Sequence, residues 1–203
     1  MNEINIEQRF KDFVIHSVNA LQNVKFNRPL NEACLRIAWC GHRSELLLTT
    51  GMGKAGHIAQ KSASLFSSLG IQAVYVHPGE ASHGDIGVIG SHSVLLAFST
   101  SGKTREVIET IEAARKLSDV KVISITSHPD GLIREHSDLV LDMGVIKEAG
   151  YLGLAPTTST LVMQMLSDFV AVTAAEILGT KVEDYALRHH GGYLGKLARR
   201  KAR

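Results

Sequence analysis

The sequence of 203 residues is poor in cysteine. Its two cysteines, Cys34 and Cys40, lie six residues apart on a predicted helix, so their side chains leave it from different faces. This spacing fits neither a CxxC redox motif nor a zinc site. We therefore predict that both cysteines pack in the core.

The sequence also lacks a recognisable signal peptide and an uninterrupted apolar run. Its first residues mix charged and scattered apolar side chains, without the apolar centre of a signal peptide. The most apolar stretch, residues 161–178, is interrupted by Gln164, Ser167, Asp168 and Glu176. A membrane span needs about 20 mostly apolar residues. We expect a buried helix at 161–178 and a cytoplasmic protein.

The formal net charge is +2, but the charged residues are unevenly distributed along the sequence. The last eight residues, KLARRKAR, hold five basic residues and no acidic one, which leaves 17 basic and 20 acidic residues elsewhere. With 44% hydrophobic and 21% charged residues, the chain is neither disordered nor coiled-coil in type. We interpret residues 196–203 as a short solvated tail, and we expect neither nucleic acid nor a membrane as a partner.

Hydrophobic spacing predicts two helices at the N-terminus. Apolar residues recur every three or four positions from Ile6 to Val24, which is typical of a helix with one buried face. A second helix is expected to begin near Pro29, because proline suits the first helical turn. We assign residues 1–44 to a helical extension that packs on the domain.

Between residues 45 and 195, short apolar strands alternate with helix-length segments. The predicted strands are 46–50, 73–76, 94–99, 122–126 and 139–141, and the predicted helices include 54–69, 104–117 and 157–178. Unbroken apolar strands are typical of a parallel sheet covered on both faces. The sequence therefore predicts one α/β domain with a five-stranded, doubly wound, flavodoxin-like parallel sheet. Ligands of such sheets bind beyond the carboxyl ends of the strands, where the strand order reverses.

The loop after the first strand is rich in glycine. It reads GMGKAG at 51–56 and has the form GxGxxG, but the second strand ends in His77-Pro78 and not in the acidic residue that a dinucleotide site uses. The P-loop pattern GxxxxGK[ST] is absent. Lys54 suits a single anionic group. Gly51 and Gly53 are candidate ligand contacts, although they could simply build a tight turn.

Hydroxyl groups gather where the third strand meets the next helix. The cluster consists of Ser99, Thr100, Ser101 and Thr104. Side-chain donors, backbone N–H groups and the helix dipole converge on an anion at such a place. A helix cap uses only one or two hydroxyls. Four hydroxyls, with Lys103 in the first turn, favour a bound monophosphate.

A third cluster, Thr157, Thr158 and Ser159, opens the last long helix. Ordinary capping would explain it if it stood alone. Together with the other loops it adds to a polar pocket.

Three loops supply acid–base groups, namely His83 after the second strand, Glu148 after the fifth and His190 near the C-terminus. Histidine titrates near neutrality, and burial can tune a glutamate towards it. No HxxxH or HExxH pair occurs, so a metal site is unsupported. The histidines that we predict to be surface or structural residues are His16, His42, His92, His128 and His136.

Together these segments resemble the sugar isomerase (SIS) domain family and, within it, the arabinose-5-phosphate isomerase branch. The resemblance covers about residues 46–195 and is carried by GMGKAGHIAQK at 51–61, VHPGEASHGDIG at 76–87, STSGKTRE at 99–106, KEAGYLGLAPTTST at 147–160 and HHGGYLG at 189–195. Gly150-Tyr151 replace a Cys-Pro of longer relatives, and His189 and Gly191 replace a Ser and a Pro. Those relatives continue into paired CBS domains, so the chain is similar to a short form that lacks them.

The resemblance implies reversible conversion of D-ribulose 5-phosphate to D-arabinose 5-phosphate through an enediol, without an organic cofactor. The product feeds synthesis of 3-deoxy-D-manno-octulosonate (Kdo), a sugar of lipopolysaccharide. The resemblance also implies a homotetramer or dimer with active sites at subunit interfaces, where His190 serves a neighbour's pocket. The implied catalytic residues are Lys54, His83, Glu106, Glu148 and His190, and the implied substrate-binding residues are Gly51, Gly53, Ser99, Thr100, Ser101, Thr104, Thr157, Thr158 and Ser159.

We expect Glu148 to move a proton between C1 and C2 and Lys54 to stabilise the developing oxyanion. His83 or His190 would assist ring opening, and Glu106 would orient Lys54 or a hydroxyl. One alternative is another phosphosugar isomerase, such as 6-phospho-3-hexuloisomerase. A second is a non-catalytic phosphosugar-binding module, which is disfavoured because the roughly 45 residues before the first strand lack a basic recognition helix.

Overall fold

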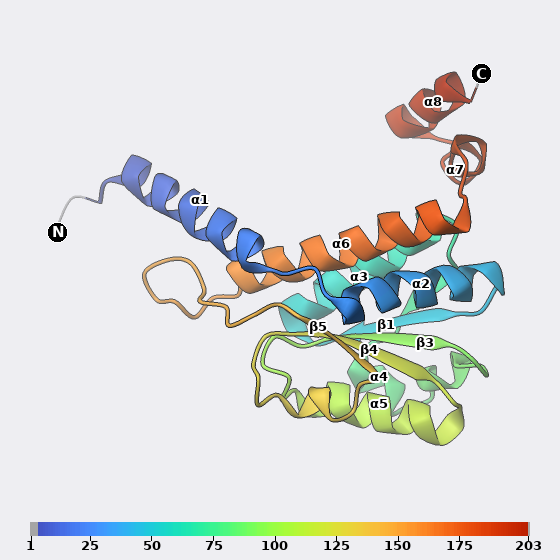
Figure 1. Ribbon diagram of the computed structural model, residues 1–203, viewed down its shortest axis with the longest axis horizontal. Coiled ribbons are helices and arrows are strands. Elements are labelled where there is room, and N and C mark those ends of the chain that lie inside the picture. Colours follow the sequence, from blue (N-terminus) through green and yellow to red (C-terminus); the bar gives the residue numbers. More distant parts are fainter. Residues whose placement is uncertain (1–3, 203) are drawn as a thin grey trace.

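Five parallel strands form the centre of the computed structural model, which describes residues 4–202 (Figure 1). The strand order is β2-β1-β3-β4-β5. The strands are β1 (Leu47–Gly51), β2 (Ala73–Tyr75), β3 (Val94–Phe98), β4 (Lys121–Thr126) and β5 (Leu139–Asp142). The predicted five-stranded parallel sheet is confirmed. Its order reverses between β1 and β3, so the loops that follow these two strands border the expected ligand site.

Successive side chains of each strand enter two different apolar cores. On β3, Val94, Leu96 and Phe98 belong to one core, and Leu95 and Ala97 belong to the other. This follows from the two-residue repeat of a strand. Because helices cover both faces, every position of β3 is buried, which explains the unbroken apolar run in the sequence.

Helices are divided between the two faces of the sheet (Figure 1). One face is covered by α2 (Arg28–His42), α3 (Gly53–Ser68) and α6 (Thr158–Leu178). The other face is covered by α4 (Pro78–Ala81), the 3₁₀ helix η1 (Asp85–Val88) and α5 (Arg105–Leu117), and a second 3₁₀ helix, η2 (Leu132–Arg134), follows β4. The doubly wound architecture is therefore present.

The helix α6 is long and apolar enough to cross a membrane by length and composition alone. Its side chains Val162, Leu166 and Val170 are buried in the core formed with α2 and α3. The core helix of an α/β domain has the same properties. We therefore assign α6 to the core.

The first helix, α1 (Ile6–Asn23), differs from the expectation. Its spacing predicted one buried face, but Ile6 is 78% and Phe10 is 68% exposed, and Ser17 is its one buried residue. Figure 1 shows the reason: α1 extends beyond the sheet, and only its C-terminal part lies beside α6. The spacing of apolar residues indicates that a helix has an apolar face, but it does not indicate which part of the protein covers that face.

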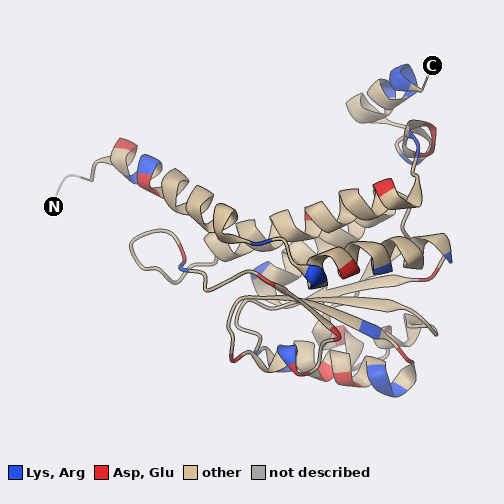
Figure 2. Cartoon of the chain, viewed as in Figure 1, with Lys and Arg blue, Asp and Glu red and all other residues tan. Residues whose placement is uncertain are grey.

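The last two helices, α7 (Val182–Arg188) and α8 (Gly192–Lys201), form a C-terminal arm that projects from the domain (Figure 1). The sequence predicted a solvated tail from residue 196. In the structure that boundary lies inside α8, and Arg203 lies outside the described residues. The basic residues of the tail gather at the far end of this helix (Figure 2).

The turn between α7 and α8 depends on a glycine. A Cβ atom at Gly195 would lie 1.8 Å from the carbonyl oxygen of His189, so no side chain fits there. The guanidinium of Arg188 lies against Gly70, which precedes β2. This contact places the C-terminal arm near the amino end of β2.

Candidate active site

A cavity of about 310 Å³ lies at the carboxyl ends of the strands. It is bordered by loops that follow β1, β3, β4 and β5, and so it lies where the strand order reverses. Its lining residues are Met52, Lys54, Ala55, Ser99, Thr100, Ser101, Thr104, His128, Glu148, Leu154, Pro156, Ser159 and Thr160. Seven of the predicted site residues thus lie together: Lys54, Ser99, Thr100, Ser101, Thr104, Glu148 and Ser159.

The loop between β3 and α5 is held by its own hydroxyl groups. Ser99 Oγ accepts a hydrogen bond from the backbone N–H of Gly102 at 3.1 Å and lies 2.9 Å from Thr104 Oγ1. Ser101 Oγ accepts from the backbone N–H of Lys103 at 3.2 Å. Thr104 is the N-cap of α5 but makes no side-chain cap hydrogen bond. The loop therefore presents hydroxyls and an open helix N-terminus to the cavity, which suits an anion.

Lys103 does not contribute its charge to this loop. Its Nζ lies 2.5 Å from Asp130 Oδ2, and hydrogen bonding to Lys103 is the main reason that the pKa of Asp130 lies below its usual value. We expected Lys103 beside the anion. The cation that lines the cavity is instead Lys54, at the N-terminal end of α3.

Glu148 caps the N-terminus of α6 with one carboxylate oxygen. Its Oε2 accepts hydrogen bonds from the backbone N–H of Thr157 at 2.9 Å and of Ser159 at 3.1 Å. Thr157 Oγ1 lies 3.3 Å from the same oxygen and also accepts from the N–H of Ala149 at 3.1 Å. These bonds fix the carboxylate on a rigid element and leave Oε1 for a ligand.

Two opposing effects act on the ionisation of Glu148. Partial burial raises the pKa of the carboxyl group, while hydrogen bonds from Ser159 and Thr157 lower it. The hydrogen bonds prevail, so the pKa of Glu148 lies below its usual value. The side chain is therefore a carboxylate at neutral pH and can accept a proton.

Two hydroxyl groups at the start of α6 are buried without a partner. Thr158 Oγ1 and Ser159 Oγ make no hydrogen bond within residues 4–202. Buried hydroxyls ordinarily have partners. Ser159 lines the cavity beside Glu148, whereas Thr158 does not line it.

The glycines of the first loop shape its backbone. A Cβ at Gly56 would lie 2.5 Å from the carbonyl oxygen of Gly51, and Gly53 has a positive φ of 56°. These positions allow α3 to begin directly after β1. We expected Gly51 and Gly53 to contact the substrate, but neither residue lines the cavity.

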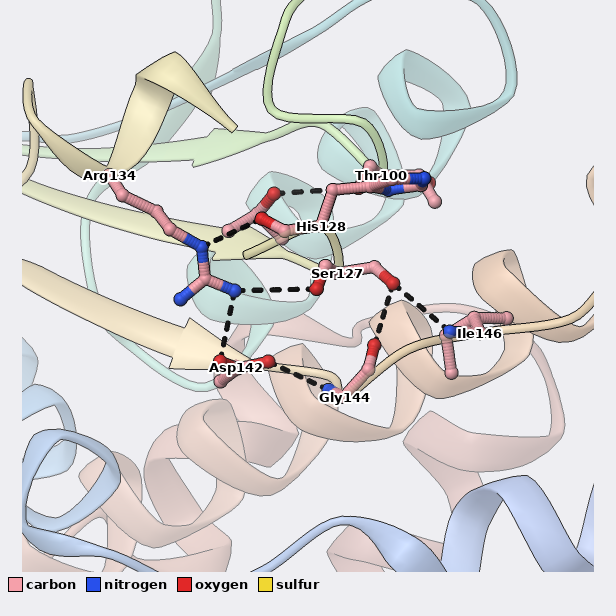
Figure 3. A network of polar contacts seen from close by, with 8 residues as sticks. Thr100, Ser127, His128, Arg134, Asp142, Gly144 and Ile146 are labelled. Atoms are coloured by element: carbon pink, nitrogen blue, oxygen red, sulfur yellow. Dashed lines mark hydrogen bonds and ion pairs between the residues drawn. The ribbon is translucent and has the colours of Figure 1, made fainter. Parts of the chain in front are cut away.

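A polar network ties the loop after β3 to the loop that carries Glu148 (Figure 3). The backbone N–H of Ser127 donates to the carbonyl oxygen of Thr100 at 3.0 Å. The hydroxyl of Ser127 donates to the carbonyl oxygen of Gly144 at 2.6 Å and accepts from the N–H of Ile146 at 3.1 Å. Ser127 therefore joins two sides of the cavity.

Arg134 reinforces the same junction (Figure 3). Its Nε donates to the carbonyl oxygen of His128 at 2.8 Å, and its guanidinium lies 3.3 Å from the carbonyl oxygen of Ser127 and 2.9 Å from Asp142 Oδ2. Asp142 in turn accepts from the N–H of Gly144 at 2.8 Å. Both ends of the network are thus fixed by a single side chain.

Three predicted catalytic residues lie outside the cavity lining. His83 is exposed in the loop after α4, and Glu106 lies in the first turn of α5 without an ion pair to Lys54 among residues 4–202. His190 is exposed in the C-terminal arm. Because the 21 residues of α6 span roughly 30 Å, His190 and Glu148 lie at opposite ends of that helix.

Two histidines have contacts that their sequence context does not reveal. His128 lines the cavity, although we predicted it to be a surface or structural residue. His128 follows β4 by two positions. The rule that ligands bind beyond the carboxyl ends of the strands therefore also predicts a place for it at the site. His16 is structural as predicted, but its partner, the carbonyl oxygen of Lys147, could not be foreseen.

Two other cavities lie elsewhere, one beside this site and one remote from it. One of about 900 Å³ lies between α1 and residues 147–151, and Glu148 also lines it. One of about 390 Å³ is lined by Trp39, Arg43 and the first residues of β3 and β4, at the opposite edge of the sheet. Among residues 4–202, no group of three His, Cys, Asp or Glu is arranged to hold a metal ion.

Comparison with known sequences gives consistent matches. A family model described as SIS domain matches residues 42–173. Arabinose 5-phosphate isomerase KdsD of Escherichia coli K12 is 39% identical over 170 residues, which make up 84% of this chain and 51% of that protein. The protein of the same name from Francisella tularensis is 37% identical over 182 residues, with coverages of 90% and 55%. The chain therefore spans about half the length of the curated relatives it matches.

Solved structures match over nearly the whole chain. A candidate phosphosugar isomerase involved in capsule formation, from Bacteroides fragilis NCTC 9343, has a TM-score of 0.89 at 38% identity and covers 93% of this chain and 100% of its own. The E. coli CFT073 protein c3406, solved in complex with arabinose 5-phosphate, has a TM-score of 0.81 at 31% identity, with the same coverages.

Proposed function

Because the chain belongs to the SIS domain family, we propose that it interconverts D-ribulose 5-phosphate and D-arabinose 5-phosphate through an enediol. One observation carries the proposal: the cavity at the β1/β3 switch point brings a fixed carboxylate, a lysine and an anion-binding loop together. The names of the curated relatives and the arabinose 5-phosphate complex of c3406 support this choice of substrate.

The substrate phosphate binds at the loop of Ser99, Ser101 and Thr104. These hydroxyls lie at the N-terminus of α5, where backbone N–H groups and the helix dipole favour an anion. Ser159 lines the same cavity beside Glu148, and its hydroxyl suits a hydroxyl of the sugar. Anchoring the phosphate contributes binding energy remote from the reacting carbons.

Glu148 transfers the proton between C1 and C2. As a carboxylate it removes the proton from the carbon next to the carbonyl group, and the resulting carboxylic acid returns it to the neighbouring carbon of the enediol. Lys54 stabilises the negative charge that develops on the carbonyl oxygen. The cap bonds from Thr157 and Ser159 hold Oε2, so the reacting oxygen is Oε1.

A second copy of the chain completes the site. His190 lies far from Glu148 in its own chain, and the large cavity beside Glu148 is bordered by exposed apolar residues of α1, such as Phe13. The C-terminal arm likewise exposes Leu187 and Tyr193, at 80% and 78%. Unpartnered apolar surfaces of this kind mark association sites. We propose a homotetramer or dimer in which the arm of one copy brings His190 to the cavity of another.

His83 and Glu106 belong to the same proposal, since neither lines the cavity in a single chain and association can change what surrounds them. We place the reaction in the cytoplasm and its product in the synthesis of Kdo. We propose capsule formation, in which the similar B. fragilis protein is involved, as a second use of the product.

The test is direct incubation of the purified protein with D-arabinose 5-phosphate in D₂O. We expect D-ribulose 5-phosphate to form and deuterium to appear at the carbon that exchanges its proton. Glu148→Gln should lower kcat by at least about 100-fold, the usual contribution of a general base. Glu176→Gln, at the other end of α6, is the matched control. No turnover of either pentose phosphate would disprove the function, and an undiminished Glu148→Gln rate would disprove the role of that residue.

A further inference from the structure

His128 occupies a place in the cavity that none of the roles above uses. It follows β4 directly after Ser127 and lines the cavity beside Thr100 and Ser101. Its backbone and its ring both bind the neighbouring loop: the N–H lies 3.4 Å and Nδ1 lies 3.1 Å from the carbonyl oxygen of Thr100 (Figure 3). The ring is therefore held against the loop that we assign to the phosphate.

The hydrogen bond to Thr100 determines which ring nitrogen is available. A carbonyl oxygen can only accept, so Nδ1 of His128 carries a proton and donates it. Nε2 makes no hydrogen bond in the part of the chain that the structure describes. The imidazole thus has one nitrogen fixed to the loop and one nitrogen left for a ligand.

Few side chains that line the cavity can donate a charged hydrogen bond to a phosphate group. Lys103, the cation within the loop itself, is engaged by Asp130. Lys54 and Glu148 are the charged groups that line the cavity together with His128, and the ion pairs Lys103–Asp130 and Arg134–Asp142 involve residues that interact with His128 or with the phosphate loop. Arg134 binds the carbonyl oxygen of His128 and does not line the cavity. His128 and Lys54 are therefore the two lining side chains that can carry a positive charge to the anion.

We propose that His128 is a further substrate-binding residue, whose Nε2 donates a hydrogen bond to the phosphate of the sugar. The inference rests on the proposed function and deepens it. A phosphate oxygen is an acceptor, so the bound form uses the imidazolium, with Nδ1 on Thr100 and Nε2 on the phosphate. His128 then links the position of the bound phosphate to the end of β4.

Three substitutions of His128 distinguish phosphate binding through Nε2 from support of the Thr100 loop through Nδ1. The amide of Asn can replace Nδ1 and keep the bond to Thr100, but it has no group at the place of Nε2. The longer Gln places a donor near Nε2. Ala removes both groups. His92→Asn is the matched control, because His92 lies in an exposed turn before β3 with a φ of 74°, a conformation that Asn tolerates.

The measurements are KM and kcat for D-arabinose 5-phosphate and the inhibition constant of inorganic phosphate. We expect His128→Asn and His128→Ala to raise both KM and the inhibition constant by on the order of tenfold, the worth of one hydrogen bond to a charged group, with kcat nearly unchanged. His128→Gln should recover most of the loss. His92→Asn should match the wild type.

The result that overturns the proposal is a His128→Asn enzyme with wild-type KM and phosphate inhibition, since His128 would then act only through Thr100. A loss confined to kcat would overturn it as well. Calorimetric titration of inorganic phosphate into Glu148→Gln protein, with and without His128→Asn, keeps the test separate from turnover. If the wild type has no isomerase activity, the proposed function fails, while a tenfold weaker phosphate affinity still supports the assignment of His128.

Discussion

The imidazole Nε2 of His16 lies 2.7 Å from the carbonyl oxygen of Lys147, although 131 positions separate the two residues. The carbonyl oxygen accepts, so His16 donates, and the contact joins the projecting helix α1 to the residue before Glu148. The N-terminal helix therefore helps to position the carboxylate on which the proposed chemistry depends.

Removal of this donor should affect catalysis more than folding. We expect His16→Ala to lower kcat/KM by about threefold to tenfold, the worth of one hydrogen bond, because the loop before Glu148 loses its contact with α1. Steady-state kinetics measures the effect, and Gln22→Ala, at an exposed position of the same helix, serves as control. Equal kcat/KM values for the two variants would contradict a positioning role.

The cap that Glu148 places on α6 should make stability depend on pH. Hydrogen bonding outweighs burial and lowers the pKa of Glu148 in the folded state, so its stabilising contribution is present above the pKa of the unfolded state and is lost as the pH falls through the lower, folded pKa. The difference in unfolding free energy between wild type and Glu148→Gln should therefore be largest near neutral pH and shrink in acid. Urea unfolding at several pH values measures it. Glu176→Gln should show no such loss of stability at neutral pH.

Mixed assemblies should reveal whether His190 acts on a neighbouring copy. Glu148→Gln and His190→Asn proteins should each be nearly inactive. Refolded together as dimers, they should regain about a quarter of wild-type activity, because half of the dimers are mixed and each mixed dimer has one intact site. Activity that stays at the level of the separate variants would show that both residues act within one chain.

The network of Figure 3 predicts a long-range effect of Arg134. Arg134→Met removes its bonds to His128, Ser127 and Asp142, and should lower kcat/KM by about tenfold because the phosphate loop and the Glu148 loop are no longer held together. Arg115→Met breaks only the exposed pair with Asp138, at 3.2 Å, and should stay within about twofold of wild type. A smaller effect of Arg134→Met than of the control would refute the coupling.

Strand positions were predicted from sequence with errors of one residue or so, because helices bury both faces of the sheet and leave unbroken apolar runs. The position of the cavity also followed from sequence, since polar loops after the strands must meet at the carboxyl edge of a parallel sheet. Lys54, Ser99, Ser101 and Glu148 meet there as expected.

The remaining features depend on contacts that have no local signature. The apolar spacing of α1 resembles that of a covered helix, yet Phe10 is exposed because no part of this chain reaches it. Lys103 was expected to face an anion, and only the fold shows that Asp130 lies within its reach. The helix α8 was missed because its basic end resembled a tail.

The length of α6 has a consequence for the behaviour of the protein in solution. With Glu148 at one end and the C-terminal arm at the other, one copy cannot hold both proposed catalytic groups in the same cavity. Catalysis would then require association, and specific activity would fall on dilution below the dissociation constant of the assembly. The proposed activity per molecule would thus depend on the protein's own concentration.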